Sequence, residues 1–257
     1  MSSSQAALSF ARSVFPAELL IPLPAIQALY DGFEQKSPGL AKRAQVRSQY
    51  PEDVESILAR AQPAFTASAF SMSADSLAFV RRLFEAAQFE TVLEFGAGVT
   101  TFALPPTLPK SARYISIDED EAYAAGIRSK VAELYPDRKI DVLSLTPAKS
   151  PTLRIALPER RVRPRSLIGL RDALVGLSLT KAPDVVIIDG PSRRVPWGRY
   201  TAVADISSLL PAGTIILLDD ALRHREVSIL GAWQRAGLVD VLGVYCIGTG
   251  TALAVRR

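Results

Sequence analysis

Residues 91–104 of this chain read TVLEFGAGVTTFAL, and this stretch decides the fold. An apolar run that ends at Phe95 leads into GAG at positions 96–98, and residues 100–104 then have the character of a helix start. The order predicts a strand, a tight glycine turn and a helix. Glycine suits such a turn because it adopts backbone conformations that other residues avoid. Its missing Cβ also lets a ligand approach the free N–H groups at the helix start.

The turn departs at two positions from the dinucleotide-binding pattern G-x-G-x-x-G. Thr101 stands where the third glycine would be, and Glu94 lies just before the first glycine. A carboxylate at this turn would repel a pyrophosphate and attract a ligand that carries cationic groups. S-adenosylmethionine, with its sulfonium and its ammonium group, is such a ligand.

At these residues the sequence resembles the class I S-adenosylmethionine-dependent methyltransferases, whose first motif runs acid-x-G-x-G-x-x-T, here Glu94 to Thr101. The resemblance covers roughly residues 73–257. It implies a Rossmann-like α/β fold with a seven-stranded, mostly parallel sheet and helices on both faces. We therefore expect an N-terminal helical extension, residues 1–70, and an S-adenosylmethionine-binding domain, residues 71–257.

Length and composition agree with one such domain. The chain has 257 residues, of which 48% are hydrophobic, and a mean hydropathy of +0.17, which is ample for a buried core. A single cysteine excludes an internal disulfide and a zinc cluster, and no apolar run is long enough to span a membrane. We expect a cytoplasmic protein with no membrane partner. The net charge of +4 is compatible with an anionic substrate but is too weak to imply nucleic-acid binding.

The first 70 residues show helical pieces interrupted by prolines, without strand-like alternation. The clearest helix begins at Pro51 and runs to Arg60. In many class I methyltransferases such a segment covers the substrate side or forms a dimer contact, so the resemblance implies a homodimer through these helices as one possibility. An extension that merely packs on the sheet is the other. A stronger amphipathic helix is predicted over residues 73–88, with Ser73 as its cap.

An acidic run follows the second predicted strand, residues 114–117. Asp118 comes about twenty residues after the glycine turn, where a parallel second strand presents an acid to ribose hydroxyls. Glu119 lies beside it. Alternatively, the acids that follow Asp118 only complement the dipole at the start of the next helix, residues 121–134.

A third strand is predicted over residues 140–143, and the resemblance implies that Ser144 then lines an adenine pocket. Residues 146–165 form a basic insertion with almost no acids. Such a run is usually a solvated loop, although guanidinium groups beside an active site would also bind phosphate or carboxylate. It contains no aromatic residue that would stack on a base, so nucleic-acid recognition is not indicated here.

Two buried strands end in carboxylates. Residues 184–188 end at Asp189, and residues 213–218 end at Asp219 and Asp220. In the family's strand order these two strands are neighbours, so the three side chains should meet at one edge of the cofactor cleft. Oxygen ligands of this kind suit Mg²⁺.

These carboxylates resemble those of the metal-assisted O-methyltransferases of the catechol and macrolide-sugar types, which implies metal binding by Asp189, Asp219 and Asp220. The sequence departs from the catechol type in two respects: Asp220 stands in place of an asparagine, and Ser192-Arg193-Arg194 in place of a basic lysine. In the metal-free alternative, Asp189 contacts the cofactor's ammonium or the substrate, and the Asp219-Asp220 pair caps the next helix.

His224, the only histidine, follows these acids and is a candidate base for deprotonating a hydroxyl, with Asp189 as the second candidate catalytic residue. The candidate substrate wall consists of Arg193, Arg194, Trp197, Arg199, Tyr200, Arg223 and Arg225. The candidate cofactor contacts are Glu94, Gly96, Ala97, Gly98, Thr100, Thr101, Asp118, Glu119, Ser144 and Asp189. The chain closes with a predicted helix over residues 226–236 and a predicted hairpin of residues 239–245 and 251–255.

These features predict in-line methyl transfer from S-adenosylmethionine to an oxygen of a small hydroxylated acceptor, either sugar-like or anionic, with Mg²⁺ as a candidate cofactor. Two alternatives stay open. One is an N-methyl or aminopropyl transferase on the same fold. The other is a catalytically silent cofactor-binding scaffold that engages a partner protein.

Overall fold

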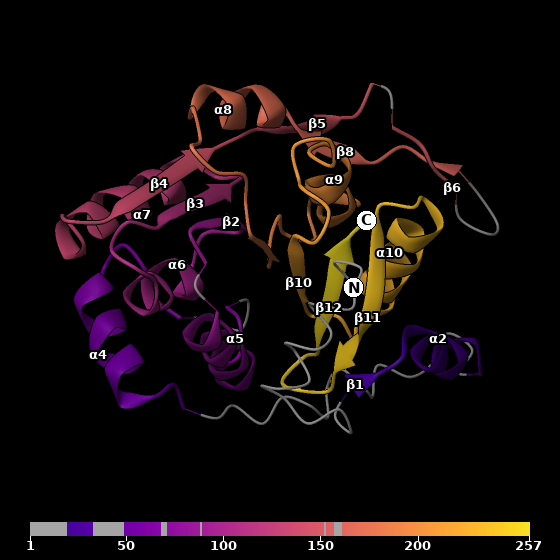
Figure 1. Ribbon diagram of the computed structural model, residues 1–257, viewed down its shortest axis with the longest axis horizontal. Helices are drawn as coiled ribbons and strands as arrows, with labels where there is room; N and C mark the ends of the chain where they lie inside the picture. Colours follow the sequence, from indigo (N-terminus) through magenta and orange to yellow (C-terminus); the bar gives the residue numbers. More distant parts are fainter. Residues whose placement is uncertain (1–19, 33–48, 68–70, 88, 152, 157–160) are drawn as a thin grey trace.

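Eight strands form the central sheet of the computed structural model, which describes residues 20–32, 49–67, 71–87, 89–151, 153–156 and 161–257 (Figure 1). Their order across the sheet is β1-β11-β12-β10-β9-β2-β3-β4. They comprise β1 (Leu20–Ile21), β2 (Thr91–Phe95), β3 (Arg113–Asp118), β4 (Lys139–Ser144), β9 (Val185–Ile188), β10 (Ile215–Asp219), β11 (Val239–Tyr245) and β12 (Thr251–Arg256). The strands from β10 to β4 run parallel, while β12 joins β10 antiparallel and β11 joins β12 antiparallel.

Helices cover both faces of this sheet. One face carries α4 (Glu52–Ala61), α5 (Ala74–Ala86), α6 (Val99–Ala103) and α7 (Glu121–Leu134). The other carries α2 (Leu23–Gly32), α8 (Leu170–Gly176), α9 (Gly198–Ala204) and α10 (His224–Arg235). In Figure 1, α4, α5 and α6 lie together on one side of the strands, and α2 and α10 on the other.

Strand alternation explains the two layers, since successive side chains point to opposite faces. In β9, Val185 and Ile187 join the core under α4 to α7, whereas Val186 and Ile188 join the core under α8 to α10. All four side chains are fully buried, which is why this strand reads as a continuous apolar run. The expected Rossmann-like α/β fold is confirmed.

The sheet differs from the sequence prediction in one added strand. The described residues contain eight strands in the sheet, not seven, because Leu20 and Ile21 form β1 and pair antiparallel with Tyr245 and Val244 of β11. Residues 1–70 were expected to be helical. A two-residue strand leaves no alternation to detect, so only the partner strand reveals it.

The basic insertion is more ordered than the expected loop. It forms two small antiparallel pairs, β5 (Pro147–Lys149) with β8 (Arg165–Leu167) and β6 (Ile155–Ala156) with β7 (Arg161–Val162). Residues 152 and 157–160 of the insertion lie outside the described residues. The hydroxyl of Thr201 in α9 donates to the Arg165 carbonyl at 2.9 Å, and the Arg165 amide donates to the Pro196 carbonyl at 3.0 Å. These bonds attach the insertion to the chain around α9.

Most predicted elements are present with small changes in their ends. The helix expected from residue 73 is α5, and the hydroxyl of Ser73 accepts from the Ser76 amide at 3.1 Å. Residue 88, its expected end, lies outside the described residues. Residues 200–210 have helical spacing in the sequence, and the structure places there the shorter helix α9, which ends at Ala204. The C-terminal hairpin is β11 with β12.

The described parts of the N-terminal segment pack on the sheet layers: α2 joins the core of α10, and α4 joins the core of α6 and α7. Residues 1–19, 33–48 and 68–70 of this segment lie outside the described residues, so only part of the predicted homodimer contact can be located. The boundary at residue 70 and the dimer contact stay predictions. Among the helices that the structure describes, none combines the length and apolar character needed to cross a bilayer.

Candidate functional site

The glycine turn lies at the carboxyl end of β2, in contact with the loop after β9. Gly96 has a φ of +96°, a conformation that favours glycine, and its amide donates to the Ile117 carbonyl at 2.8 Å. A Cβ on Gly96 would lie 2.5 Å from the Gly190 nitrogen. A Cβ on Gly190 would lie 2.6 Å from the Gly96 Cα. Both positions therefore require glycine so that the two loops can meet.

Gly190 is a site residue that sequence reasoning missed. The amides of Asp189 and Gly190 both donate to the Phe95 carbonyl, at 2.9 and 2.6 Å, so the ends of β2 and β9 are joined through their main chains. The sequence carries a weak signal, a glycine directly after the acid that ends a buried strand. Its meaning depends on knowing that β9 lies beside β2.

Glu94 lies behind the turn, with its side chain fully buried. Its carboxylate accepts hydrogen bonds from the hydroxyls of Thr100, Thr101 at 2.6 Å and Ser116 at 2.6 Å. Burial raises the pKa of Glu94 to about 7. The Gly98 amide in turn donates to the Thr101 hydroxyl at 2.9 Å, so Glu94 holds the turn and the start of α6 together.

Asp118 connects β3 to the same turn. Its carboxylate accepts from the Ala97 amide at 3.0 Å and from the Asp120 amide at 2.9 Å, and burial raises its pKa to about 6. Ser144 is the residue opposite it on β4. The carboxylate of Glu119 accepts from the Ser192 amide at 2.8 Å, which links β3 to the loop after β9. The predicted cofactor residues thus gather at the carboxyl ends of adjacent strands, as a ligand at this edge requires.

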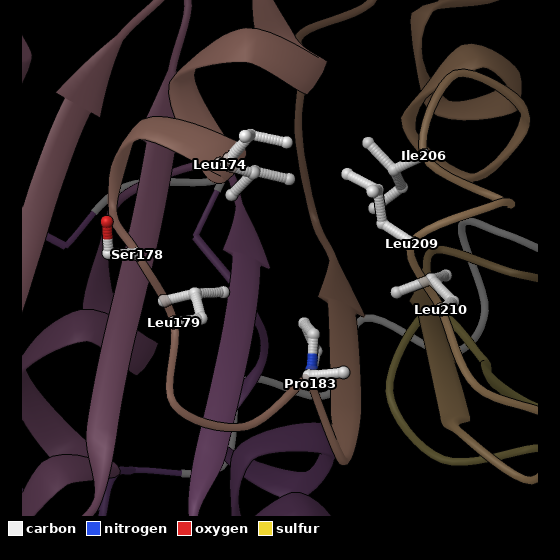
Figure 2. Close-up of a pocket in the computed structure, with 9 residues that line it drawn as sticks. Leu174, Ser178, Leu179, Pro183, Ile206, Leu209 and Leu210 are labelled. Carbon is white, nitrogen blue, oxygen red and sulfur yellow. The ribbon is translucent and has the colours of Figure 1, made fainter.

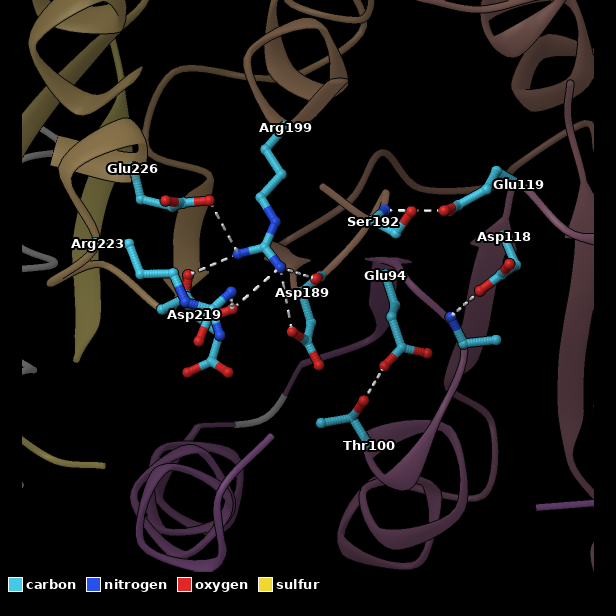
Figure 3. A network of polar contacts seen from close by, with 12 residues as sticks. Glu94, Thr100, Asp118, Glu119, Asp189, Ser192, Arg199, Asp219, Arg223 and Glu226 are labelled. Atoms are coloured by element: carbon cyan, nitrogen blue, oxygen red, sulfur yellow. Dashed lines mark hydrogen bonds and ion pairs between the residues drawn. The ribbon is translucent and has the colours of Figure 1, made fainter. Parts of the chain in front are cut away.

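The structure also brings Asp189, Asp219 and Asp220 together. A ligand atom from each lies within 4.8 Å of the others (Figure 3). Asp219 ends β10, and β10 lies beside β9, whose end carries Asp189. Burial raises the pKa of Asp189 to about 7 and holds the pKa of Asp219 well above its usual range. We call these three side chains the carboxylate cluster.

Arg199 of α9 points into the carboxylate cluster, between Asp189 and Glu226 (Figure 3). Only 7% of this residue is exposed. Its guanidinium donates to the main-chain carbonyls of Asp189 and, at 3.0 Å, Asp219. It also lies 3.2 Å from a carboxylate oxygen of Asp220 and 3.7 Å from one of Glu226. Arg199 and Tyr200 were expected on a substrate wall, but both are buried, because α9 turns them toward the sheet and α10. Glu226 was not singled out at all.

The carboxylate cluster fits a divalent cation by its donors and its charge. The Oδ1 atom of Asp219 is buried and has no hydrogen-bond partner within the described part of the chain. Thr251 is its direct partner across the β10–β12 ladder, and the Thr251 hydroxyl is likewise buried and unpartnered there. Two unpartnered oxygens on the same side of a sheet offer acceptor atoms that a cation or an ordered water would satisfy.

Several solved structures share this arrangement of strands. O-methyltransferase TomG from Streptomyces achromogenes, solved with S-adenosylmethionine, is 16% identical, covers 88% of this chain and 99% of its own, and gives a TM-score of 0.52. This chain has the class I methyltransferase fold. Cofactor-bound Rv0187 from MTB is 19% identical over 92% of this chain and 98% of its own, with a TM-score of 0.51.

A third neighbour with the class I methyltransferase fold is the methyltransferase PaMTH1 from Podospora anserina, solved with S-adenosylhomocysteine. It is 14% identical over 88% of this chain and 97% of its own, with a TM-score of 0.51. No protein-family model matches the sequence, and no curated protein matches it either.

The remaining predicted residues of this class I methyltransferase fold lie around the carboxylate cluster. His224 begins α10 and is exposed, and it does not belong to the group of acids that lie within 4.8 Å of one another. Its role as a base stays a prediction. Arg193, Arg194 and Arg225 are exposed, Trp197 is half-buried, and the Arg225 guanidinium donates to the Arg193 carbonyl at 3.3 Å.

A separate apolar cavity of about 270 Å³ lies at the other end of β9, next to Pro183 (Figure 2). It is lined by Leu174, Val175, Ser178, Leu179, Ala182, Pro183, Ile206, Leu209 and Leu210. In the class I methyltransferase fold this is the edge away from the glycine turn. Since its lining carries no charged group, we assign it no part in the chemistry.

Proposed function

We propose that this chain is an S-adenosylmethionine-dependent O-methyltransferase that acts on a small hydroxylated acceptor. The observation that carries the proposal is the meeting of two sets of groups at one sheet edge. The glycine turn with Asp118 forms one set, and the carboxylate cluster forms the other. The backbone contact between Gly96 and Gly190 holds them side by side. A methyl donor and an acceptor hydroxyl need this kind of alignment for in-line transfer.

On the donor side, Asp118 would bind the ribose hydroxyls. Each of its oxygens already accepts one amide hydrogen bond, and a carboxylate oxygen has room for a second. Ser144, opposite it, would lie toward the adenine. Glu94 would act through its charge from behind the turn, since a sulfonium or ammonium nearby favours its ionised form.

On the acceptor side, Asp189, Asp219 and Asp220 would hold Mg²⁺. When bound, Mg²⁺ would lower the pKa of an acceptor hydroxyl. Asp189 and Asp219 would orient the acceptor, and His224 would accept a proton from its hydroxyl. The exposed guanidinium groups of Arg193, Arg194 and Arg225 favour an acceptor with an anionic group.

Calorimetry with S-adenosylmethionine and S-adenosylhomocysteine tests the proposal, with NAD as the competing ligand. We expect micromolar binding of the first two by the wild type and marked weakening in Asp118→Ala. Asp137→Ala is the matched control, because Asp137 is an exposed carboxylate that pairs with Lys110 at the surface. Absence of binding, or a preference for NAD, would contradict the proposal.

Once cofactor binding is established, a panel of hydroxylated acceptors assayed with and without EDTA tests the acceptor side. We expect EDTA to suppress methylation and added Mg²⁺ to restore it. If EDTA does not change turnover with any accepted substrate, the proposed role of Mg²⁺ is contradicted. The methyltransferase proposal itself would still stand.

A further inference from the structure

The carboxylate cluster belongs to a larger buried network of charges. The network contains four carboxylates and two guanidinium groups, from Asp189, Asp219, Asp220, Glu226, Arg199 and Arg223. When every group is ionised, it carries two excess negative charges. How the charges pair decides where that excess lies.

The two arginines lie among three of the four carboxylates, Asp189, Asp220 and Glu226. One oxygen of Asp220 lies 3.2 Å from Arg199 and 2.5 Å from Arg223. Glu226 reaches the other side of the Arg199 guanidinium at 3.7 Å, and only 2% of Glu226 is exposed. Asp189 lies at a similar distance from Arg199, 3.6 Å, so three carboxylates share two guanidinium groups.

Asp219 is the carboxylate of the network that makes no ion pair within the described residues. The nearest cation to the Asp189 carboxylate is Arg199 at 3.6 Å, beyond hydrogen-bond distance, and Arg199 binds the main-chain carbonyl of Asp219 and not its carboxylate. The unpartnered Oδ1 of Asp219 points to the same conclusion within the residues described. When all its groups are ionised, the network as a whole is left with two negative charges, which one divalent cation would match.

We propose that Arg199 is a built-in counter-cation that sets the charge of the carboxylate cluster, so that the cluster accepts one divalent cation. Arg199 is a positioning residue: it offsets the charge of Asp189, Asp220 and Glu226 and anchors the ends of β9 and β10 through their carbonyls. The proposal rests on the proposed function, whose metal-binding residues it explains. It accounts for Asp220, since an aspartate paired with two guanidinium groups presents the cluster with little more charge than an asparagine would.

Charge-compensating variants test this assignment: Arg199→Met, Glu226→Gln and the double variant, with Arg199→Lys as the charge-conserving control. Without added metal, Arg199→Met should lower the Tm because it leaves buried carboxylates unbalanced. Adding Glu226→Gln should recover a large part of that loss, and Arg199→Lys should lose less than Arg199→Met. A double variant no more stable than Arg199→Met would mean that Arg199 acts by packing, which would overturn the proposal.

Titration with Mg²⁺ and Mn²⁺ at one fixed pH gives the second readout. Glu226→Gln keeps both arginines and removes one negative charge, so we expect it to weaken divalent-cation binding by roughly tenfold. The double variant should return to within about threefold of wild type, because its charge is balanced again. If Arg199→Met does not fold, the Glu226→Gln titration alone decides.

Unchanged cation affinity in Glu226→Gln, or no cation binding by the wild type, would overturn the assignment. S-adenosylmethionine binding is measured on the same samples. If the wild type does not bind S-adenosylmethionine, the proposed function is contradicted. If it binds the cofactor normally but cation affinity does not change in Glu226→Gln, only the role of Arg199 is contradicted.

Discussion

Glu94 makes the glycine turn sensitive to pH, because the carboxyl group that holds the turn together has a raised pKa. Its side chain is inaccessible to solvent and accepts three hydroxyl hydrogen bonds, with no cationic side chain among its hydrogen-bond partners. Hydroxyl donors satisfy the oxygens but do not neutralise the charge, so desolvation dominates and raises the pKa. Ionising this group in the folded protein therefore costs free energy.

The first residue-scale prediction is a pH dependence with a definite sign. The pKa of Glu94 is about 7 in the folded protein against 4.5 for the ordinary group, so its contribution to stability is fully present below pH 4.5 and is lost as the pH rises through 7. Relative to Glu94→Gln, the wild type should lose about 3 kcal/mol of unfolding free energy across this interval. Denaturant titrations of both proteins without ligand measure it. Curves that stay parallel would contradict the prediction.

The second residue-scale prediction concerns Gly190. Gly190→Ala places a Cβ against the Gly96 main chain, which cannot move without disturbing the turn. We expect a loss of about 1–3 kcal/mol and weaker S-adenosylmethionine binding. Gly176→Ala in α8 is the matched control: a Cβ there meets no atom, so alanine should be neutral or slightly stabilising. Wild-type stability and cofactor affinity in Gly190→Ala would show that the loops need no close contact.

Among the elements, β1 pairs with β11 beside Gly243, a position at which a side chain would not fit. Gly243 has a φ of +155° beside an irregularity in the β11–β12 register, and a Cβ there would lie 2.8 Å from the Ile21 carbonyl and 2.8 Å from the Leu20 side chain. The edge strand β1 can therefore lie close to β11 because Gly243 has no side chain.

Gly243→Ala should therefore release β1 while leaving the parallel strands in place. We expect the Leu20 and Ile21 amides to exchange about tenfold faster or more, with little change in the amides of β2 and β9. Hydrogen exchange measures both sets, and Gly126→Ala in α7, where a Cβ only touches Ala64 at 3.9 Å, is the control. Equal exchange of β1 in the variant and the wild type would refute this account of the edge.

For the whole molecule, the features that could be predicted from the sequence are those that depend on residues close together in the chain. β9 and β10 are continuous apolar runs that end in acids, and the turn after β2 has its glycines and hydroxyls within eight residues. Periodicity and turn chemistry are sufficient for such features. The edge at which Asp118 and the carboxylate cluster gather then follows from the strand order.

The parts that it missed depend on contacts between distant segments. From the sequence, Arg199 was expected on a substrate wall, and its partner Glu226 only as the first residue of the helix over residues 226–236. Only the packing of α9 and α10 on the same face brings them together. Gly190 acquires its meaning from Gly96, which lies far away in the sequence. No local pattern records these pairs.

The joined ends of β2 and β9 bear on which hydroxyl of an acceptor the proposed methyl transfer would modify. Asp189 directly precedes Gly190, and both amides donate to the Phe95 carbonyl, so the main chain that carries this carboxylate cannot move away from the glycine turn unless two core strands separate. The distance between the loop after β9 and the glycine turn is therefore fixed. Of the several hydroxyls of an acceptor, only one that fits this distance would lie next to the methyl group. We therefore expect regioselectivity to be set by the backbone spacing of two loops, with little need for a pocket shaped to the whole acceptor.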